Sequence, residues 1–434
     1  MSSIWSLDTK FPQKEMLRED KRVEVVVIGA GMAGLLTAYL LKQENVDTIV
    51  LEANRIGGGQ TMNTTAKITS QHNLIYDNLI NKFGIEIARG YALANEEALQ
   101  NYIDIIESQS IDCHLQREPA YVYTLSDESK IEKEVKAANK LGIMAEYTTK
   151  TSLPFDVMAS IRFPNQASFN PLDFIKAISK DLTIYENTMV RKVEDDKVIT
   201  DRAKVTAKHI VVATHYPFIN FPGYYFLRMH QERAYVLALE NAVKLDGMYR
   251  DESDSGFSFR NYKDKLILGG PGHRTGKNKY GGYYDKLKSA AADFFPNSRE
   301  VCRWSAQDCV TVDNIPYIGR YSSSTPNMYV ATGFKKWGMT SSMVSAKLIR
   351  DLILERENPY EEVFTPQRFK VSASMKTLNE EVKEATKGLI VEKLKIPKKT
   401  LEGIKEGCGE IIELDGRKYG VYKDKEGKVF SIIP

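Results

Sequence analysis

The chain has 434 residues, of which 42% are hydrophobic, so it is long enough to form roughly two or three domains with substantial cores. Its 60 basic and 57 acidic residues give a formal net charge of +3, and no short segment concentrates the basic residues, which argues against nucleic-acid binding. Residues 1–21 lack the apolar centre of a signal peptide and no later apolar run reaches membrane-spanning length, so we expect a cytoplasmic protein with neither a nucleic-acid nor a membrane partner.

The first predicted elements form a βαβ unit within "VVVIGAGMAGLLTAYLLKQENVDTIVLEA", residues 25–53. A β-branched run predicts a buried strand over 22–28, and the apolar spacing predicts a helix over 32–43. A second strand is predicted over 47–51. This order of elements is typical of a Rossmann-like α/β sheet with parallel strands.

Three glycines at G-x-G-x-x-G spacing occupy the turn between the first strand and the helix. Gly29 permits the tight turn, Gly31 lets the backbone approach a pyrophosphate, and Gly34 allows close packing of the helix on the strand. Glu52 lies eighteen residues past Gly34 (52 minus 34), where a carboxylate accepts hydrogen bonds from a ribose 2′-hydroxyl and repels a 2′-phosphate. The unit therefore predicts dinucleotide binding and disfavours NADP, while NAD and FAD both stay open.

Three later stretches extend this prediction. The loop "NRIGGGQTMNTTAKITSQH" (54–72) is rich in glycine and small hydroxylated residues, which suits a backbone that passes close to an extended cofactor. Strands are predicted over 209–213 and 328–331, and the second of them leads through a glycine-containing turn into an amphipathic helix. In a flavoprotein, the N-terminus of this helix would aim backbone N–H groups and a dipole of about +0.5 charge at the N1/C2=O edge of the isoalloxazine.

The ordered set of motifs resembles the D-amino-acid oxidase-like FAD-dependent oxidoreductases, and within them the branch with a C-terminal Rieske iron–sulfur domain. The resemblance runs from Val23 to about Phe369, and its specific parts are "VVVIGAGMAGLLTAYLL" with Glu52, "TTAKITSQH", "NQASFNPLDFIKAI", "RWSAQDCVTVDNIPYIGR" and "ATGFKKWGMT". It implies an α/β plus α+β fold, in which an FAD-binding Rossmann-like domain is interleaved with an antiparallel-sheet substrate domain.

By the same resemblance, residues 1–82, 159–217 and 298–369 form the FAD-binding domain. Residues 83–158 and 218–297 form the substrate domain. Both of these insertions contain tyrosine-rich stretches, "AYVYT" in the first and "QERAYVLAL" and "GGYYDK" in the second. Such tyrosines suit an aromatic cage over the flavin, and they equally suit ordinary strand positions on a half-buried sheet.

The resemblance also implies which residues hold FAD. The residues of 64–67 and 333–340 would surround the flavin ring, and Val190 would contact the adenine through its backbone. The implied cofactor-binding residues, in chain order, are Gly29, Gly31, Met32, Ala33, Gly34, Glu52, Ala53, Gly59, Thr64, Thr65, Ala66, Lys67, Val190, Ala213, Thr214, Gly333, Lys336, Gly338, Met339 and Thr340.

Lys67 and Lys336 are the candidate catalytic residues, because each lies in a motif expected to flank the flavin. Positive charge there would stabilise the reduced ring or steer oxygen or a substrate carboxylate, although most lysines are solvated surface charges. Arg260 would bind a substrate carboxylate bidentately, with a surface strand arginine as the alternative interpretation. We expect His72 to be a structural residue. The candidate substrate contacts are Gln166, Tyr235, Arg260 and Trp337.

The mechanism implied by the resemblance is transfer of a hydride equivalent from a carbon bearing an amine to flavin N5, which gives an imine that hydrolyses. The cofactor carries the chemistry, so no dedicated nucleophile or metal is expected. The substrate would be a small amine or amino acid, and the electron acceptor stays open. The alternative is a flavin-binding electron-transfer or assembly protein with little turnover of its own, and a NAD-dependent dehydrogenase is a third reading.

The composition changes after Arg368. Residues 370–400 are rich in lysine and glutamate at helical spacing and predict a linker helix. Residues 401–434 alternate as roughly two or three short strands, with turns at Asp415-Gly416 and Glu426-Gly427, and resemble the opening strands of a Rieske domain. Exposed edges of these strands would favour a homodimer.

A Rieske [2Fe-2S] cluster needs two cysteines and two histidines, and no histidine follows His273. The cysteines Cys113, Cys302, Cys309 and Cys408 are scattered without a C-x-x-C pair, so neither a disulfide framework nor a metal site is expected in residues 1–434. We therefore expect the cluster only in a longer native chain, of which this sequence would be a shortened or truncated form.

Overall fold

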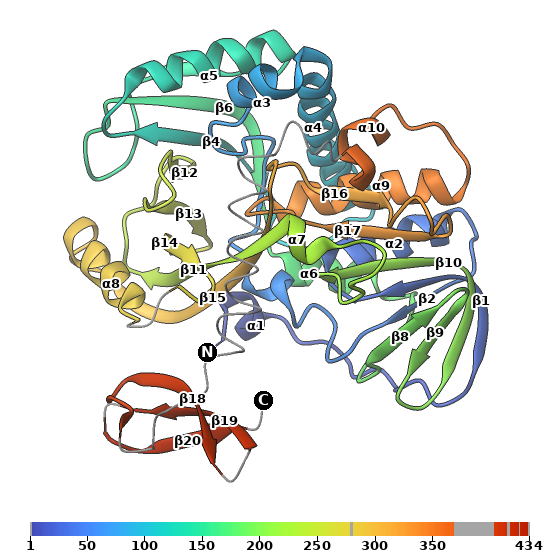
Figure 1. The fold of residues 1–434 in the computed structure, drawn as a ribbon. Helices are drawn as coiled ribbons and strands as arrows, with labels where there is room; N and C mark the ends of the chain where they lie inside the picture. The colour runs from blue at the N-terminus through green and yellow to red at the C-terminus, as the bar shows by residue number, and fades with distance from the viewer. Residues whose placement is uncertain (1, 278–280, 369–402, 415–416, 425, 433–434) are drawn as a thin grey trace.

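The computed structural model describes residues 2–277, 281–368, 403–414, 417–424 and 426–432, and Figure 1 labels its elements. The strands form three sheets. The linker helix predicted over 370–400 lies outside the described residues. Among the helices that are described, none is both long and apolar enough to cross a membrane.

The first sheet has eight strands in the order β16-β17-β10-β1-β2-β7, and β9 joins β8 to the edge of β10. Neighbouring strands from β17 to β7 run parallel, which confirms the predicted α/β sheet. Its strands are β1 (Lys21–Ile28), β2 (Thr48–Leu51), β7 (Thr183–Tyr185), β8 (Val190–Glu194), β9 (Lys197–Thr200), β10 (Lys204–His215), β16 (Tyr317–Arg320) and β17 (Met328–Thr332).

The residues of β1 explain why this strand sits in the middle of the sheet. Val25 and Val27 pack into the core cluster that contains the apolar side chains of α2 (Met32–Gln43) and α9 (Gly338–Ile353). Val26 and Ile28 point to the other face and pack into a second core cluster. A strand that is buried on both faces reads as a continuous apolar run, as this one does.

The second sheet has nine strands in the order β15-β11-β14-β13-β12-β4-β6-β3, with β5 paired to β6, and is mostly antiparallel. Its strands are β3 (Lys67–Ile68), β4 (Gln116–Thr124), β5 (Glu146–Thr148), β6 (Ala159–Ser168), β11 (Met229–Glu240), β12 (Met248–Asp251), β13 (Ser258–Tyr262), β14 (Lys265–Arg274) and β15 (Arg299–Thr311).

This second sheet takes β3, β6 and β15 from outside the two segments that the sequence assigned to the substrate domain. Apolar alternation predicts that a segment is a strand, but it does not identify the sheet in which the strand pairs. The division of the chain into two domains stays a prediction.

The helices cover both large sheets (Figure 1). Helices α2 and α9 pack on each other beside the first sheet, and α5 packs on β6 while α8 packs on β11 and β14 of the second. The remaining helical bounds are α1 (Ile4–Asp8), η1 (Gln60–Asn63), α3 (Tyr76–Phe83), α4 (Ile85–Ser108), α5 (Glu128–Leu141), α6 (Pro171–Ile178), α7 (Tyr225–Arg228), α8 (Tyr283–Phe294), α10 (Glu361–Phe364) and η2 (Pro366–Arg368).

A third, antiparallel sheet at the C-terminal end consists of β18 (Cys408–Leu414), β19 (Arg417–Lys423) and β20 (Val429–Ile432). The predicted turn at Glu426-Gly427 joins β19 to β20, where Gly427 has φ +81° and its N–H donates to the carbonyl oxygen of Asp424 at 3.2 Å. The other predicted turn, at residues 415–416, lies outside the described residues.

Candidate active site

A cavity of about 500 Å³ opens where the carboxyl ends of the parallel strands meet the second sheet. Its lining includes Ile28, Leu51, His215 and Ala331, which lie at or next to the ends of β1, β2, β10 and β17. Ligands of open α/β sheets bind at this edge of the sheet. The cavity is therefore the place to look for both a cofactor and a substrate.

The glycine turn after β1 forms one wall of this cavity. Gly29 has φ +108°, and a Cβ atom on Gly34 would lie 2.0 Å from the carbonyl oxygen of Gly29. Both positions therefore require glycine, the first for its backbone conformation and the second for the close packing of α2 on β1. A Cβ on Gly31 would meet only the Thr61 hydroxyl oxygen, at 3.3 Å, so the backbone at Gly31 leaves room for a ligand.

Glu52 joins the glycine turn to the end of β2. Its Oε2 accepts a hydrogen bond from the Ala30 N–H at 2.9 Å, and its Oε1 accepts one from the Asn54 N–H at 2.8 Å. Each carboxylate oxygen can accept a further hydrogen bond. Glu52 can therefore hold the turn and still bind a hydroxyl group in the cavity.

The first turn of α9 reaches the same cavity. Trp337 is the N-cap residue and makes no side-chain capping hydrogen bond, while Gly338 lines the cavity. Behind them, the Thr340 hydroxyl donates to the carbonyl oxygen of Thr69 at 3.1 Å, and Nε2 of His72 lies 3.0 Å from the same hydroxyl. Burial lowers the pKa of His72 to about 3, so this neutral ring ties the loop after β3 to α9.

Arg250, from β12, presents a cation to the cavity. Its guanidinium carbon lies 5.6 Å from the centre of the Trp337 indole, on which the His72 ring stacks at 4.8 Å. Nη2 of Arg250 lies 3.8 Å from Oδ1 of Asp254, and Nε is buried without a hydrogen-bond partner in the described part of the chain. Burial lowers the pKa of Arg250, but an arginine stays protonated in proteins. Arg250 therefore has N–H donors available to bind an anion.

Lys67 lies on β3 and is half-buried in the wall of the cavity. Its Nζ donates to the carbonyl oxygen of Tyr249 at 3.2 Å. Burial lowers the pKa of Lys67 to about 7, and the positive charges of Arg250 and Arg260 act in the same direction. Lys67 is therefore an amine that can lose its proton near neutral pH.

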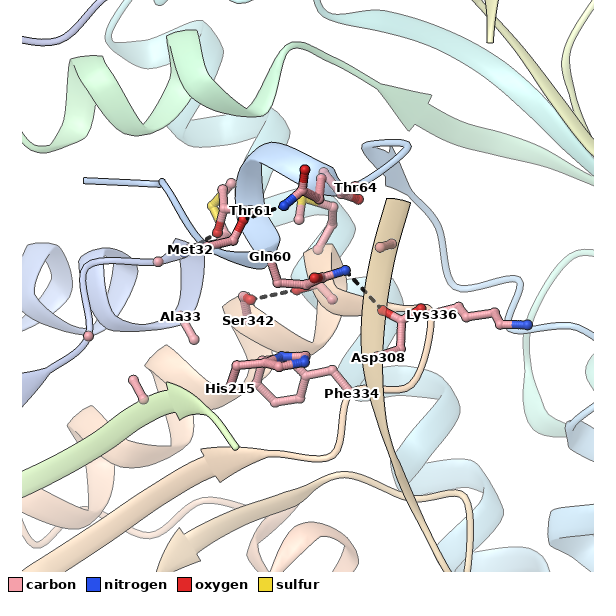
Figure 2. A pocket seen from close by; sticks show the side chains of 18 of the residues that line it. Met32, Ala33, Gln60, Thr61, Thr64, His215, Asp308, Phe334, Lys336 and Ser342 are labelled. Atoms are coloured by element: carbon pink, nitrogen blue, oxygen red, sulfur yellow. Dashed lines mark hydrogen bonds between the residues drawn. The ribbon is translucent and has the colours of Figure 1, made fainter. Parts of the chain in front are cut away.

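Asp308 and Lys336 lie at the same end of the cavity (Figure 2). Oδ1 of Asp308 lies 3.4 Å from Nε2 of Gln60, and burial raises the pKa of Asp308 to about 7. Nζ of Lys336 lies 3.9 Å from both Oε2 of Glu232 and Oδ1 of Asp254. Burial lowers the pKa of Lys336.

The structure brings most of the predicted site residues to this one cavity, although their roles toward a cofactor or a substrate stay predictions. Figure 2 shows Met32 and Ala33 of α2 at the opposite end from Lys336, with Gln60 between them. The predicted residues that line the cavity are Gly29, Gly31, Met32, Ala33, Glu52, Ala53, Gly59, Thr64, Thr65, Lys67, Val190, Ala213, Thr214, Tyr235, Lys336, Trp337, Gly338 and Met339.

Arg260 lies apart from most of the predicted site residues, because its side chain does not line the cavity. Arg260 is only 1% exposed, and its Nη1 donates to the carbonyl oxygens of Thr65 at 2.8 Å, Ala66 at 2.6 Å and Phe169 at 3.3 Å. It is therefore not a surface arginine, and its role toward a substrate carboxylate stays a prediction. It holds the chain just before β3 in place.

Five other predicted residues also lie outside the lining of the cavity. Gln166 is buried, and its Oε1 accepts a hydrogen bond from the Ser70 N–H at 2.8 Å, so it supports the loop after β3. The remaining four lie behind the lining residues, where they serve packing and hydrogen bonding, and they are Gly34, Ala66, Gly333 and Thr340.

The sequence did not single out several residues that line the cavity. Gln60, Thr61 and Asp308 fall inside quoted motifs, so their stretches were recognised but their side chains were not. Arg250 lies in a strand without a motif, and only the pairing of β12 with β4 and β13 carries it to the cavity. Asp254, His215 and Ser342 also line the cavity without having been singled out, whereas Phe334 and Lys335 belong to the stretch 333–340 that was expected to surround the flavin ring.

Comparison with known proteins agrees with this geometry. Residues 24–352 match the family of FAD dependent oxidoreductases. The chain is 35% identical to a Bacillus subtilis protein named as a Rieske 2Fe-2S iron–sulfur protein, YhfW, over 98% of this chain and 87% of that protein. It is 22% identical to glycine oxidase of the same organism, over 78% of this chain and 94% of the oxidase. Among solved structures, the L-amino acid deaminase of Proteus vulgaris with its insertion sequence deleted has a TM-score of 0.68 at 20% identity, over 83% and 97% of the two chains.

Proposed function

The chain belongs to the FAD-dependent oxidoreductase family, and we propose that it uses FAD to oxidise the carbon–nitrogen bond of a small amine or amino acid. One observation carries the proposal. A single cavity joins the glycine turn and Glu52 at one end to Arg250, Trp337, Lys67 and Asp308 at the other. This arrangement suits a dinucleotide and an adjacent small polar substrate.

The residues at the first end fit FAD. The backbone at Gly31 leaves the space that a side chain would fill, and this N-cap glycine offers no capping side chain, although the Met32 N–H donates to the Thr61 hydroxyl at 2.9 Å. The positive end of α2 favours a pyrophosphate. Glu52 keeps acceptor capacity for the ribose hydroxyls, and Val190 offers its backbone to the adenine. The first turn of α9 places a second uncapped helix N-terminus at the cavity.

Bound FAD supplies the acceptor for the two electrons and the hydrogen that leave the carbon of the substrate. Lys336, and Lys67 while it is protonated, then act as positive charges that stabilise negative charge on the cofactor. Both are half-buried, and charges in a site shielded from water interact more strongly than charges in bulk solvent.

We assign the carboxylate of an amino-acid substrate to Arg250 rather than to Arg260. Each arginine has one buried nitrogen without a partner in the described residues, Nε of Arg250 and Nη2 of Arg260. Only Arg250 lines the cavity, whereas Nε and Nη1 of Arg260 donate to backbone carbonyl oxygens. The indole of Trp337 packs beside the guanidinium and keeps its plane fixed. An arginine held in this way can bind a carboxylate with two parallel hydrogen bonds.

Turnover with a dye that accepts two electrons as artificial acceptor tests the proposed function. Purified protein with bound FAD is supplied with glycine, other α-amino acids and the matching amines that lack the carboxylate. We expect at least one compound to reduce the dye and to yield one carbonyl product for each dye molecule reduced. A protein that binds FAD but forms no carbonyl product from any of these compounds would instead be an electron-transfer or assembly protein.

The variant Arg250→Met tests the carboxylate assignment with the same assay. Loss of a charge-assisted, bidentate pair costs about 1.5–3 kcal/mol, so we expect KM for the amino acid to rise roughly 10- to 100-fold. KM for the matching amine should not change. Arg191→Met, at an exposed arginine paired with Asp201, is the matched control. An equal rise in KM for the acid and the amine would remove Arg250 from carboxylate binding.

A further inference from the structure

Asp308 is the carboxylate of the cavity that has the fewest partners. It lies on β15, opposite Glu232 of β11, and is 9% exposed. Within the described residues its side chain accepts one hydrogen bond, from Nε2 of Gln60, and at 3.4 Å this bond is long. Gln60 is itself fixed, because its Oε1 accepts a hydrogen bond from the Gln307 N–H at 3.0 Å. The second carboxylate oxygen of Asp308 has no hydrogen bond in the described part of the chain.

The cations near Asp308 are engaged by other acids. Nζ of Lys336 lies 3.9 Å from Glu232 and from Asp254, and Nη2 of Arg250 lies 3.8 Å from Asp254. In the portion of the chain that the structure describes, no lysine or arginine nitrogen lies within ion-pair distance of Asp308. A buried carboxylate without a cation is costly, so such a group calls for a positively charged ligand.

We propose that Asp308 binds the ammonium group of the substrate and accepts a proton from it, which prepares the amine for oxidation. This inference rests on the proposed function, because it names the part of the substrate that the second end of the cavity recognises. Arg250 and Asp308 line the same end of the cavity, so one molecule can offer a carboxylate to the first and an ammonium group to the second.

The step moves one proton and no electrons. An N–H bond of the ammonium group breaks, an O–H bond forms at Asp308, and the nitrogen keeps the lone pair that a carbon–nitrogen double bond requires. The carboxyl group of Asp308 and the amino group of the substrate both become neutral. Neither Asp308 nor the substrate nitrogen then carries a charge when the carbon–nitrogen bond is oxidised.

Burial in the cavity brings the pKa of the Asp308 carboxyl group and the pKa of a substrate ammonium group closer together. Burial raises the pKa of Asp308 to about 7, with Glu232 acting in the same direction and Lys336, Arg250 and Gln60 opposing it. Among the amines that line this cavity, burial lowers the pKa of Lys67 to about 7 and also lowers the pKa of Lys336. A substrate ammonium group that enters the same surroundings is subject to the same burial. Proton transfer between groups of similar pKa has little free-energy cost, and an acceptor near pH 7 suits catalysis at that pH.

Anaerobic reduction of the bound flavin by the best compound of the panel tests the proton transfer. We expect Asp308→Asn to keep its FAD and to be reduced at least about 100-fold more slowly at pH 7. The defect should shrink as the pH approaches the solution pKa of the substrate amine, because the neutral amine then enters without needing an acceptor. Asp201→Asn, at an exposed aspartate paired with Arg191, is the control and should match the wild type at every pH.

A binding experiment separates failure of this inference from failure of the proposed function. The probe is tert-butylammonium, which has no hydrogen on the carbon bearing nitrogen and so cannot be oxidised, and tert-butanol is its neutral counterpart. Each is titrated into the oxidised holoenzyme, and binding is followed by the change in the visible spectrum of the flavin. We expect tert-butylammonium to bind at least tenfold more tightly to the wild type than to Asp308→Asn, and tert-butanol to bind both equally.

Several results would overturn the inference. They are a wild type that shows no response to tert-butylammonium, equal binding of this ion to both proteins, a pH profile of Asp308→Asn identical to that of the wild type, or loss of FAD from Asp308→Asn alone. If tert-butylammonium distinguishes the two proteins but no amine reduces the flavin, Asp308 is an ammonium site and only the proposed oxidation fails.

Discussion

Replacing Lys67 by methionine should stabilise the FAD-free protein at neutral pH and have less effect at alkaline pH. Lys67 has a pKa of about 7 in the folded chain against a usual value of 10.5, chiefly because it is buried. Between these values the unfolded chain holds a proton that the folded chain has released, so the stability of the wild type rises with pH. At about 1.4 kcal/mol for each pKa unit, the rise from pH 7 to pH 10 is at most about 3.5 kcal/mol, and less where water in the cavity hydrates the ammonium group.

Urea unfolding of the FAD-free protein at pH 7, 8, 9 and 10, followed by tryptophan fluorescence, measures this effect. We expect Lys67→Met to exceed the wild type in stability by the largest margin at pH 7 and the margin to narrow steadily toward pH 10. Lys136→Met, at an exposed lysine on α5, controls for the general effect of removing a lysine. A margin that does not change with pH would mean that Lys67 has an ordinary pKa, and the account of the buried amine would be wrong.

Two further substitutions test the framework of the site. Gly34→Ala would place its Cβ 2.0 Å from the carbonyl oxygen of Gly29, so the backbone must move. We expect the free energy of unfolding, measured by thermal unfolding, to fall by roughly 1–3 kcal/mol and FAD to bind more weakly. Gly59→Ala, whose Cβ would meet no atom within 4 Å, should have a free energy of unfolding within about 0.5 kcal/mol of the wild type. An equal loss of stability in Gly34→Ala and Gly59→Ala would contradict the packing argument. Arg260→Met removes the donor shared by the carbonyl oxygens of Thr65, Ala66 and Phe169. A buried unsatisfied group costs roughly 1–3 kcal/mol, so we expect a clear fall in the unfolding temperature. An unchanged unfolding temperature would return Arg260 to the candidate substrate ligands.

The part of the site that the sequence predicts best is the one held by local geometry. The helix expected over 32–43 is α2 at the same bounds, and Gly34 meets the carbonyl oxygen of Gly29 only five residues away. Turn, helix and following carboxylate all lie within one βαβ unit, so their contacts follow from spacing along the chain. The same reasoning placed Glu52 at the end of the second strand as a ribose contact, and the structure adds that Glu52 accepts a hydrogen bond from the Ala30 N–H.

The end of the cavity that is proposed to bind the substrate could not be predicted from spacing along the chain, because its residues meet only through the pairing of distant strands. Arg250 and Arg260 lie on neighbouring strands, β12 and β13, ten residues apart (260 minus 250). One reaches the cavity and the other binds backbone carbonyl oxygens, and nothing in the composition of either strand distinguishes them. Asp308 likewise gains its surroundings from the register of β15 against β11.

The most direct test of the central claim is the visible spectrum of the purified protein, recorded without oxygen before and after addition of an amine or amino acid from the panel. The account predicts flavin bands that belong to one FAD for each chain, as identified after release from the unfolded protein, and rapid loss of the oxidised band when a substrate is added. A protein that carries FAD whose spectrum no amine or amino acid changes, or a colourless protein that binds NAD instead, would contradict it.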